Sequence, residues 1–169
     1  MNLSENKLLM HLKVTCEETL IGFSLGVAMG IVIAIILWWS DFLSKVAEPF
    51  LVVLNSLPKV ALGPIIIIWV GAGKGAIITM GIAISLIVTI MEILNGFLNT
   101  DKEKIKMAQT FNCSKLQLLT KIIIPANVTT FINSLKINIG LSLVGVITGE
   151  FLVSKAGLRI LNSLWRSSI

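Results

Sequence analysis

The sequence predicts an all-α membrane protein, a polytopic bundle of about four to five helical spans with a helix-turn-helix loop on the cytoplasmic side. Hydrophobic residues make up 55% of the 169 residues and charged residues only 14%, which is too little polar surface to cover a soluble core. The apolar runs have helix length and lack two-residue alternation, so they predict helices rather than barrel strands. Residues 1–169 are therefore expected to form a single transmembrane domain.

The first span is expected over residues 20–39, close to the length of about 20 residues that a hydrocarbon core requires. It ends in two tryptophans, which favour the membrane interface. Gly22, Gly26 and Gly30 recur every four residues and leave one helix face without side chains. This pattern predicts a face for close helix packing.

The second apolar region covers residues 46–70 and is interrupted by NSLPKVALGP. Pro58 and Pro64 each lack a backbone donor, so we expect a broken span. Broken membrane helices are common along transport pathways, which makes Pro58, Lys59 and Pro64 candidates for a pathway or gate. A simple proline kink is the alternative.

The third span is expected over residues 76–98, after the segment GAGKG. A phosphate-binding loop would need a glycine where Ile68 stands and a serine or threonine where Gly75 stands. We therefore interpret GAGKG as a turn. Glu92 lies near one end of this span, where it either reaches water or serves the pathway.

The fourth apolar stretch, residues 122–153, is too long for one simple span and predicts a bent helix with an interfacial beginning. Lys136 and Glu150 lie within it, and an ionisable group in a membrane is costly enough to mark a pathway, a partner or an interface. Both are candidates for a pathway or gate. The alternatives are that Lys136 extends to the interface and that Glu150 reaches water at the span's end.

The distribution of lysines predicts the orientation. Residues 98–121 hold five lysines against one in residues 71–75, so the positive-inside bias places 98–121 in the cytoplasm. Residues 71–75 and the N-terminal segment then lie outside. The cationic tail that holds Lys155, Arg159 and Arg166 would also lie outside unless a further helix or a re-entrant turn follows, and this conflict leads us to expect a partial polypeptide.

Several other classes of function find little support. The net charge of +5 is spread between apolar runs rather than gathered on one basic face, so it fits a membrane surface and not nucleic acid. Cys16 and Cys113 lack metal-type spacing and are read as reduced thiols. His11 is the only histidine, so neither a metal cluster nor a catalytic triad is visible.

The longest polar interval holds KMAQTFNCSKLQLLTKIIIP, residues 106–125. Ile105 and Ala108 form a partial apolar stripe on a wetted helix, and Ser114 is a suitable N-cap for a second helix. Asn112 between them tolerates the left-handed conformation of a tight turn, and Pro125 marks the return to the membrane. A solvated loop is the alternative.

This segment resembles the EAA loop of membrane subunits in bacterial binding-protein-dependent ABC importers, whose pattern is Glu-Ala-Ala, three residues, Gly, nine residues, Ile, one residue, Leu and Pro. The spacing fits throughout, and the departures are Lys106, Met107 and Asn112. The residues at the matching places are Lys106, Met107, Ala108, Asn112, Ile122, Ile124 and Pro125.

Four further stretches resemble the nitrate, sulfonate and taurine branch of these permeases. They are LIGFSLGVAMG at 20–30, LPKVALGPIIIIWVGAG at 57–73, NG at 95–96 and GEFLVSKAGL at 149–158. Arg159 departs where that branch usually has a second glycine. The family normally carries one helix before the first span found here and one after Gly157, which again implies a partial permease.

The resemblance implies a type I importer permease that is not itself an enzyme and binds no cofactor. A separate cytoplasmic ATPase subunit would use ATP, and the loop at about 99–121 would couple it to the spans. Residues 103–116 would form the contact, with Met107, Ala108 and Phe111 as its apolar centre. The other implied partners are a second permease copy in a homodimer, an extracytoplasmic solute-binding protein and the lipid bilayer of the bacterial plasma membrane.

The substrate and the class of transporter stay open at this stage. Lys59 and Lys136 would suit a small anion such as a sulfonate, nitrate or taurine, but the same branch also serves neutral and cationic solutes. One alternative function is that of an incomplete, non-transporting fragment or a regulatory membrane protein. A channel or secondary transporter is the other, because a broken span and intramembrane charges suit it equally.

Overall fold

The computed structural model describes the backbone of residues 2–167, and it describes side chains for residues 13–58 and 61–154. Within this part of the chain the structure is helical and contains no strand, which confirms the all-α class. The elements are α1 (Asn2–Trp39), α2 (Asp41–Ser56), η1 (Lys59–Leu62), α3 (Gly63–Val70), α4 (Lys74–Leu98), α5 (Lys102–Thr110), α6 (Lys115–Leu118), η2 (Leu119–Ile123), α7 (Ile124–Ala126) and α8 (Val128–Ser167).

Three of these helices contain segments long and apolar enough to cross a membrane: Lys13–Trp39, Lys74–Leu98 and Val128–Ser154. The predicted second span is broken, as expected, into α2 of 16 residues and α3 of 8 residues. At about 1.5 Å per residue, neither piece alone covers a hydrocarbon core of about 30 Å. The bundle therefore has three continuous spanning helices and one broken segment within the described residues.

The two prolines at the break itself, Pro58 and Pro64, have different roles. Pro58 lies in the break after α2, and its carbonyl accepts a hydrogen bond of 2.8 Å from the Ala61 amide. Pro64 occupies the first turn of α3. Backbone N–H groups in the first turn have no acceptor within the helix, so a residue without this donor is tolerated there. Pro64 therefore lies at the expected break, in the first turn of the helix that follows it.

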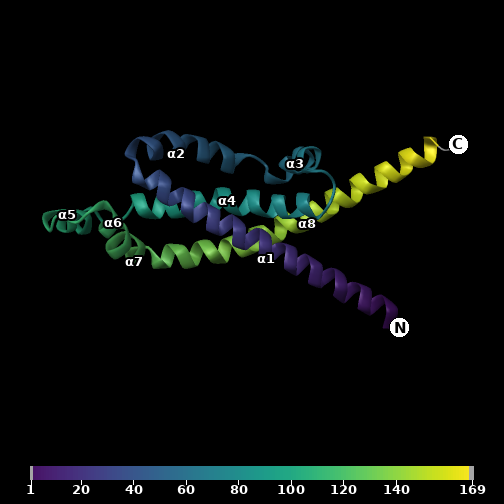
Figure 1. Ribbon diagram of the computed structural model, residues 1–169, viewed down its shortest axis with the longest axis horizontal. Helices are drawn as coiled ribbons and strands as arrows, with labels where there is room; N and C mark the ends of the chain where they lie inside the picture. Colours follow the sequence, from purple (N-terminus) through teal and green to yellow (C-terminus); the bar gives the residue numbers. More distant parts are fainter. Residues whose placement is uncertain (1, 168–169) are drawn as a thin grey trace.

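The central helix of the bundle is α4, which packs against both α1 and α8, and these two helices also contact each other. Figure 1 shows α5, α6 and α7 gathered at one end of this bundle, while the start of α1 and the end of α8 diverge at the opposite end. The polar loop therefore lies beyond the ends of the spans.

The glycines of α1 bring it into close contact with α4. A Cβ atom on Gly22 would lie 3.4 Å from the Cα atom of Gly81, and one on Gly30 would lie 2.7 Å from the Cβ atom of Thr89. Gly26 lies between them and is also buried. Because these positions carry no side chain, the two backbones approach without a layer of larger residues between them.

An adjacent face of α4 receives α8 in the same way. A Cβ atom on Gly145 would lie 3.2 Å from the Cα atom of Gly81, and one on Gly149 would lie 3.1 Å from the Cα atom of Ile77. Gly81 thus touches both neighbouring helices. The position of α4 is set from two sides by residues with little or no side chain.

The main apolar core lies between the spans at the end that carries the loop. Its aromatic centre is Phe97 of α4. The Phe97 ring packs edge-on against Trp38 of α1 at 6.3 Å and in a tilted arrangement against Phe131 of α8 at 5.9 Å between ring centroids. Two residues of η2 enter this core, so the loop is anchored in the bundle. The buried members are Ala34, Leu51, Ile90, Ile93, Leu94, Phe97, Leu119 and Ile123.

The contact of α1 with α4 predicts how much stability the protein loses when a methyl group is added at Gly30. We expect Gly30→Ala to lower the free energy of unfolding by about 1–3 kcal/mol, because the new Cβ atom would overlap Thr89, which is completely buried. Gly140→Ala in α8 is the matched control, since nothing lies within 4 Å of the added atom. Thermal unfolding in detergent micelles measures both, and equal melting temperatures would contradict this packing.

Candidate functional site

The polar loop is a helix, a tight turn and a second short helix. The Asp101 side chain begins α5 by accepting a hydrogen bond of 2.9 Å from the Glu103 amide. After α5, Asn112 has a φ angle of 54°, the left-handed conformation expected from the sequence. Asparagine adopts this conformation more readily than other residues with a side chain, apart from aspartate. The chain therefore reverses direction at Asn112.

The second helix of the loop starts with a reciprocal cap. The Ser114 hydroxyl accepts a hydrogen bond of 3.3 Å from the Gln117 amide, and the Ser114 amide donates one of 3.0 Å to the Gln117 side chain. This capping box satisfies two backbone donors at the start of α6. The loop is thus an ordered helical hairpin rather than a solvated coil.

The loop exposes three large apolar side chains, which we call the loop's apolar surface: Met107, Phe111 and Leu116, with exposed fractions of 60%, 76% and 60%. The predicted contact centre also included Ala108, and this assignment needs correction. Ala108 is only 2% exposed, so its side chain is not available to a partner on the surface of the loop. It supports the loop from within, whereas Lys106 is exposed.

Two contacts join the loop to the spans. The Lys115 ammonium donates a hydrogen bond of 3.4 Å to the carbonyl of Trp39, the last residue of α1, where a cation is favourable. The π-helical turn η2 inserts Leu119 and Ile123 into the bundle core. Pro125 follows in the first turn of α7, and Ile122 is half-buried. Motion of the loop would therefore act on α1 and on the core.

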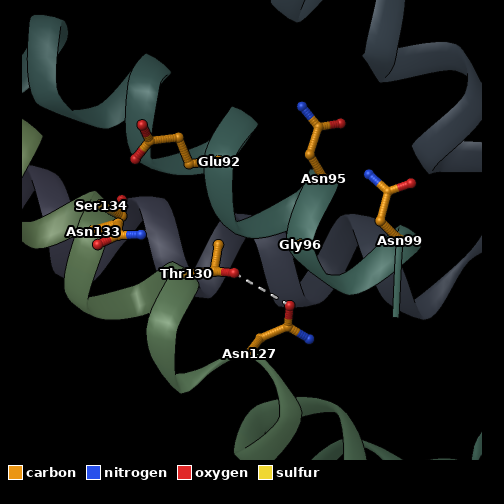
Figure 2. Close-up of a pocket in the computed structure, with 8 residues that line it drawn as sticks. All are labelled: Glu92, Asn95, Gly96, Asn99, Asn127, Thr130, Asn133 and Ser134. Carbon is orange, nitrogen blue, oxygen red and sulfur yellow. Dashed lines mark hydrogen bonds between the residues drawn. The ribbon is translucent and has the colours of Figure 1, made fainter. Parts of the chain in front are cut away.

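A polar recess lies close to these contacts, between the second half of α4 and the beginning of α8. Its volume is about 530 Å³. Figure 2 shows α4 supplying one wall and α8, with the residue before it, the other. The lining residues are Glu92, Asn95, Gly96, Asn99, Asn127, Thr130, Asn133 and Ser134.

Helical periodicity explains why these side chains meet. On α4, residues 92, 95, 96 and 99 share one face, and residues 127, 130, 133 and 134 follow the same spacing into α8. Of these residues, the sequence by itself had indicated only Glu92 and the pair at 95–96. A search for polar residues at helical spacing would have found both stripes, but not that they face each other.

Asn127 forms the floor of the recess and connects the two walls. Its side-chain amide donates hydrogen bonds of 2.8 Å to the Thr100 hydroxyl and 2.9 Å to the Ile123 carbonyl. Its side-chain oxygen faces the Thr130 hydroxyl at 3.5 Å (Figure 2). Asn127 is only 8% exposed, so this network links the end of α4, η2 and the start of α8.

Glu92 is the acidic group of the recess. Its side chain is half-buried, and its Oε2 atom is buried without a hydrogen-bond partner among the described residues. A buried polar atom without a partner is costly, and more so for a carboxylate within a span. This oxygen is therefore suited to accept a hydrogen bond from water or a solute.

Glu150 belongs to a different cluster, at the opposite end of the bundle. Its Oε1 atom accepts a hydrogen bond of 2.6 Å from the Thr15 hydroxyl, which joins α8 to α1. Glu18 of α1 is 4% exposed, and its Oε2 atom lacks a hydrogen-bond partner within the described part of the chain. Glu150 and Lys74 are the charges that act on Glu18. The recess and this cluster are separate.

The remaining pathway candidates do not converge on the recess. Pro58 and Pro64 are exposed on the broken segment, and the Lys59 side chain lies outside the described residues. Lys136 is exposed one helical turn beyond Asn133 and does not line the recess. Among the residues with described side chains, no group of three His, Cys, Asp or Glu could hold a metal ion.

Comparisons with known proteins identify the chain's relatives. Residues 26–169 match the family model described as the binding-protein-dependent transport system inner membrane component. The chain is 32% identical to a Haemophilus influenzae protein named as an ABC transporter permease, over 88% of this chain and 60% of the relative. It is 25% identical to the formylaminopyrimidine transport permease protein of Halalkalibacterium halodurans, over 93% of this chain and 63% of the relative.

Other relatives are named for the transport of other substrates. The chain is 24% identical to a Bacillus subtilis protein named as an aliphatic sulfonates transport permease, over 87% of this chain and 53% of the relative. Across these three matches, the chain spans between 53% and 63% of the relative's length.

The joint at Asn127 predicts a large effect of one small substitution. We expect Asn127→Ala to lower the free energy of unfolding by about 1–3 kcal/mol, because it removes two hydrogen bonds at a buried site. Asn133→Ala, an exposed amide on the same recess, is the control and should change stability by no more than about 0.5 kcal/mol. Thermal unfolding of both variants in micelles tests this, and equal losses would argue against the joint.

The turn at Asn112 predicts a difference between glycine and valine. Asn112→Gly should leave the hairpin intact, whereas Asn112→Val should destabilise it by about 1–2 kcal/mol, because a β-branched residue resists the left-handed conformation. Amide hydrogen exchange in α5 and α6 is the measurement. Faster exchange is expected for the valine variant alone, and identical exchange in both variants would refute this account of the turn.

Proposed function

Because this chain belongs to the family of binding-protein-dependent transport system inner membrane components, we propose that it forms a solute pathway in a bacterial ABC importer and couples it to a separate ATPase subunit. The family and the three apolar helices make it a multi-pass protein of the bacterial inner membrane. ABC permeases are not enzymes themselves, so in this proposal ATP hydrolysis belongs to the partner.

The position of the polar recess carries the proposal. A recess lined by four asparagines, two hydroxyl residues and a glutamate is unfavourable against lipid, so it requires water, a solute or another polar surface. It lies on a spanning pair of helices and its floor is the joint from which the loop projects. In this proposal the recess belongs to the solute path, and the loop that contacts the ATPase lies next to it.

The loop's apolar surface supports docking of a soluble partner. Met107, Phe111 and Leu116 project from the same hairpin among several lysines. Exposed apolar side chains surrounded by charged ones are typical of protein contact sites. An ATPase that closes on ATP would move this hairpin, and the Lys115 contact and η2 would pass the motion to α1 and the core.

The other proposed partners follow from the family rather than from contacts within the chain. We propose a second permease copy, which would complete the wall of the pathway, and an extracytoplasmic solute-binding protein that delivers the solute. The family's own description names dependence on a binding protein. Relatives are named for formylaminopyrimidine, aliphatic sulfonate, riboflavin and taurine transport, so the names leave both heterocycles and anions as candidate solutes.

The docking role of Phe111 can be measured directly. Phe111→Ala should weaken binding of the ATPase subunit by about tenfold or more, because a buried aromatic anchor typically contributes more than about 1.4 kcal/mol to an interface. The measurement is titration of the purified ATPase subunit against the permease in nanodiscs. Phe50→Ala is the control, since Phe50 is 66% exposed but lies on α2.

Two outcomes would count against the proposal. Unchanged affinity of the Phe111→Ala variant would remove this surface from the ATPase contact. Solute flux that needs no ATPase would favour a channel or secondary transporter. Ala108→Glu does not test docking, because Ala108 is buried and its replacement would disrupt the hairpin itself.

A further inference from the structure

We propose that the polar recess admits uncharged or cationic solutes that donate hydrogen bonds, and that it excludes anions. This inference rests on the proposed function, because it concerns the solute of the same pathway. It commits to one solute class where the relatives' names leave several.

The charges around the recess carry the first step. Among the residues whose side chains the structure describes, Glu92 is the one ionisable residue in the lining, and no lysine, arginine or histidine joins it there. A carboxylate in a half-buried setting repels anions more strongly than it would in bulk water, because the surrounding protein screens charge poorly. The recess therefore favours neutral or positively charged molecules.

Lys136, which had favoured an anion, does not change this balance. Lys136 is exposed one helical turn beyond Asn133 and is not among the lining residues. Lys59 belongs to η1 in the broken segment, and its side chain lies outside the described residues. An anion that entered between α4 and α8 would meet Glu92 without a cation in the lining to balance it.

The hydrogen-bonding groups carry the second step. An ionised carboxylate only accepts hydrogen bonds, and the buried Oε2 atom of Glu92 has no partner among the described residues. Asn95, Asn99 and Asn133 are exposed, and their amides can both donate and accept (Figure 2). A solute with N–H groups next to ring or carbonyl acceptors complements both kinds of group, whereas a sulfonate offers acceptors alone.

The size of the recess agrees with a small organic solute. Its volume of about 530 Å³ falls in the range of about 300–1,000 Å³ that is usual for small-molecule sites. A single-ring heterocycle with an amino group, such as an aminopyrimidine, would fit this space and this pattern of donors and acceptors. The class we infer is thus small, uncharged or cationic, and rich in N–H donors.

Charged thiol reagents test the charge preference without knowledge of the natural solute. Cys16 and Cys113 are replaced by serine, Asn133→Cys is introduced, and the full chain is assembled with its ATPase subunit in nanodiscs. The rates of reaction with a trimethylammonium and a sulfonate methanethiosulfonate are then measured, each divided by its rate with free cysteine. We expect the cationic reagent to be favoured at least tenfold, and Glu92→Gln to bring the ratio close to one.

Glu17→Gln is the matched control, because Glu17 is an exposed carboxylate 61% accessible on α1, outside the recess lining. It should leave the ratio unchanged. A ratio near one with Glu92 present, or the same ratio in the Glu92→Gln variant, would overturn the proposal. Failure of both reagents to react would also overturn it, because the recess would then be closed by lipid or by a second copy of the chain.

Protection experiments test the donor preference. An excess of 4-aminopyrimidine should slow modification of the cysteine at position 133 at least threefold, and ethanesulfonate should not. Equal protection by both compounds, or none by 4-aminopyrimidine, would refute the inferred class. Binding of the ATPase subunit is measured on the same samples, so a failure of this inference with docking intact leaves the proposed importer standing.

Discussion

The close approach of α1, α4 and α8 is the constraint on which the rest of the structure depends. Lipid provides no hydrophobic force that drives helices together, so spanning helices associate through packing at short range. Gly22 and Gly145 bring both α1 and α8 against Gly81. This arrangement makes α4 the central helix, places Phe97 between aromatic residues of both neighbours, and brings the polar half of α4 opposite the start of α8.

The polar groups of the bundle separate into two kinds once this packing is set. Asn127 is buried and satisfied by Thr100 and Ile123, so it serves as a joint between helices. Glu92 has a buried oxygen without a protein partner within the described residues, and it lies beside exposed amides. The satisfied group at Asn127 stabilises the connection to the loop. The unsatisfied group at Glu92 is suited to bind a molecule that enters the recess. In the proposed importer, their adjacency would offer a physical route from ATPase docking to the solute pathway.

Much of the loop could be predicted from local sequence. The left-handed turn at Asn112 and the cap at Ser114 depend on residues within a few positions of each other, and local geometry decides them. The burial of Ala108 could not be predicted in this way, because it depends on which face of α5 turns toward the spans. Pro64 shows a similar limit of local sequence. The residue type shows that a backbone donor is missing, but only the structure shows that Pro64 lies in the first turn of α3, where no donor is needed.

The sequence by itself determined the class of protein, the positions of the apolar helices, the glycine face of α1 and the ordered hairpin between the last two spans, because each follows from composition or from short-range periodicity. Only the tertiary structure decided that two polar stripes, more than 25 residues apart in the chain, face each other across one recess, while Glu150 joins another cluster. The physical reason is that helical spacing defines a face but not its partner. The partner is chosen by close packing through glycine.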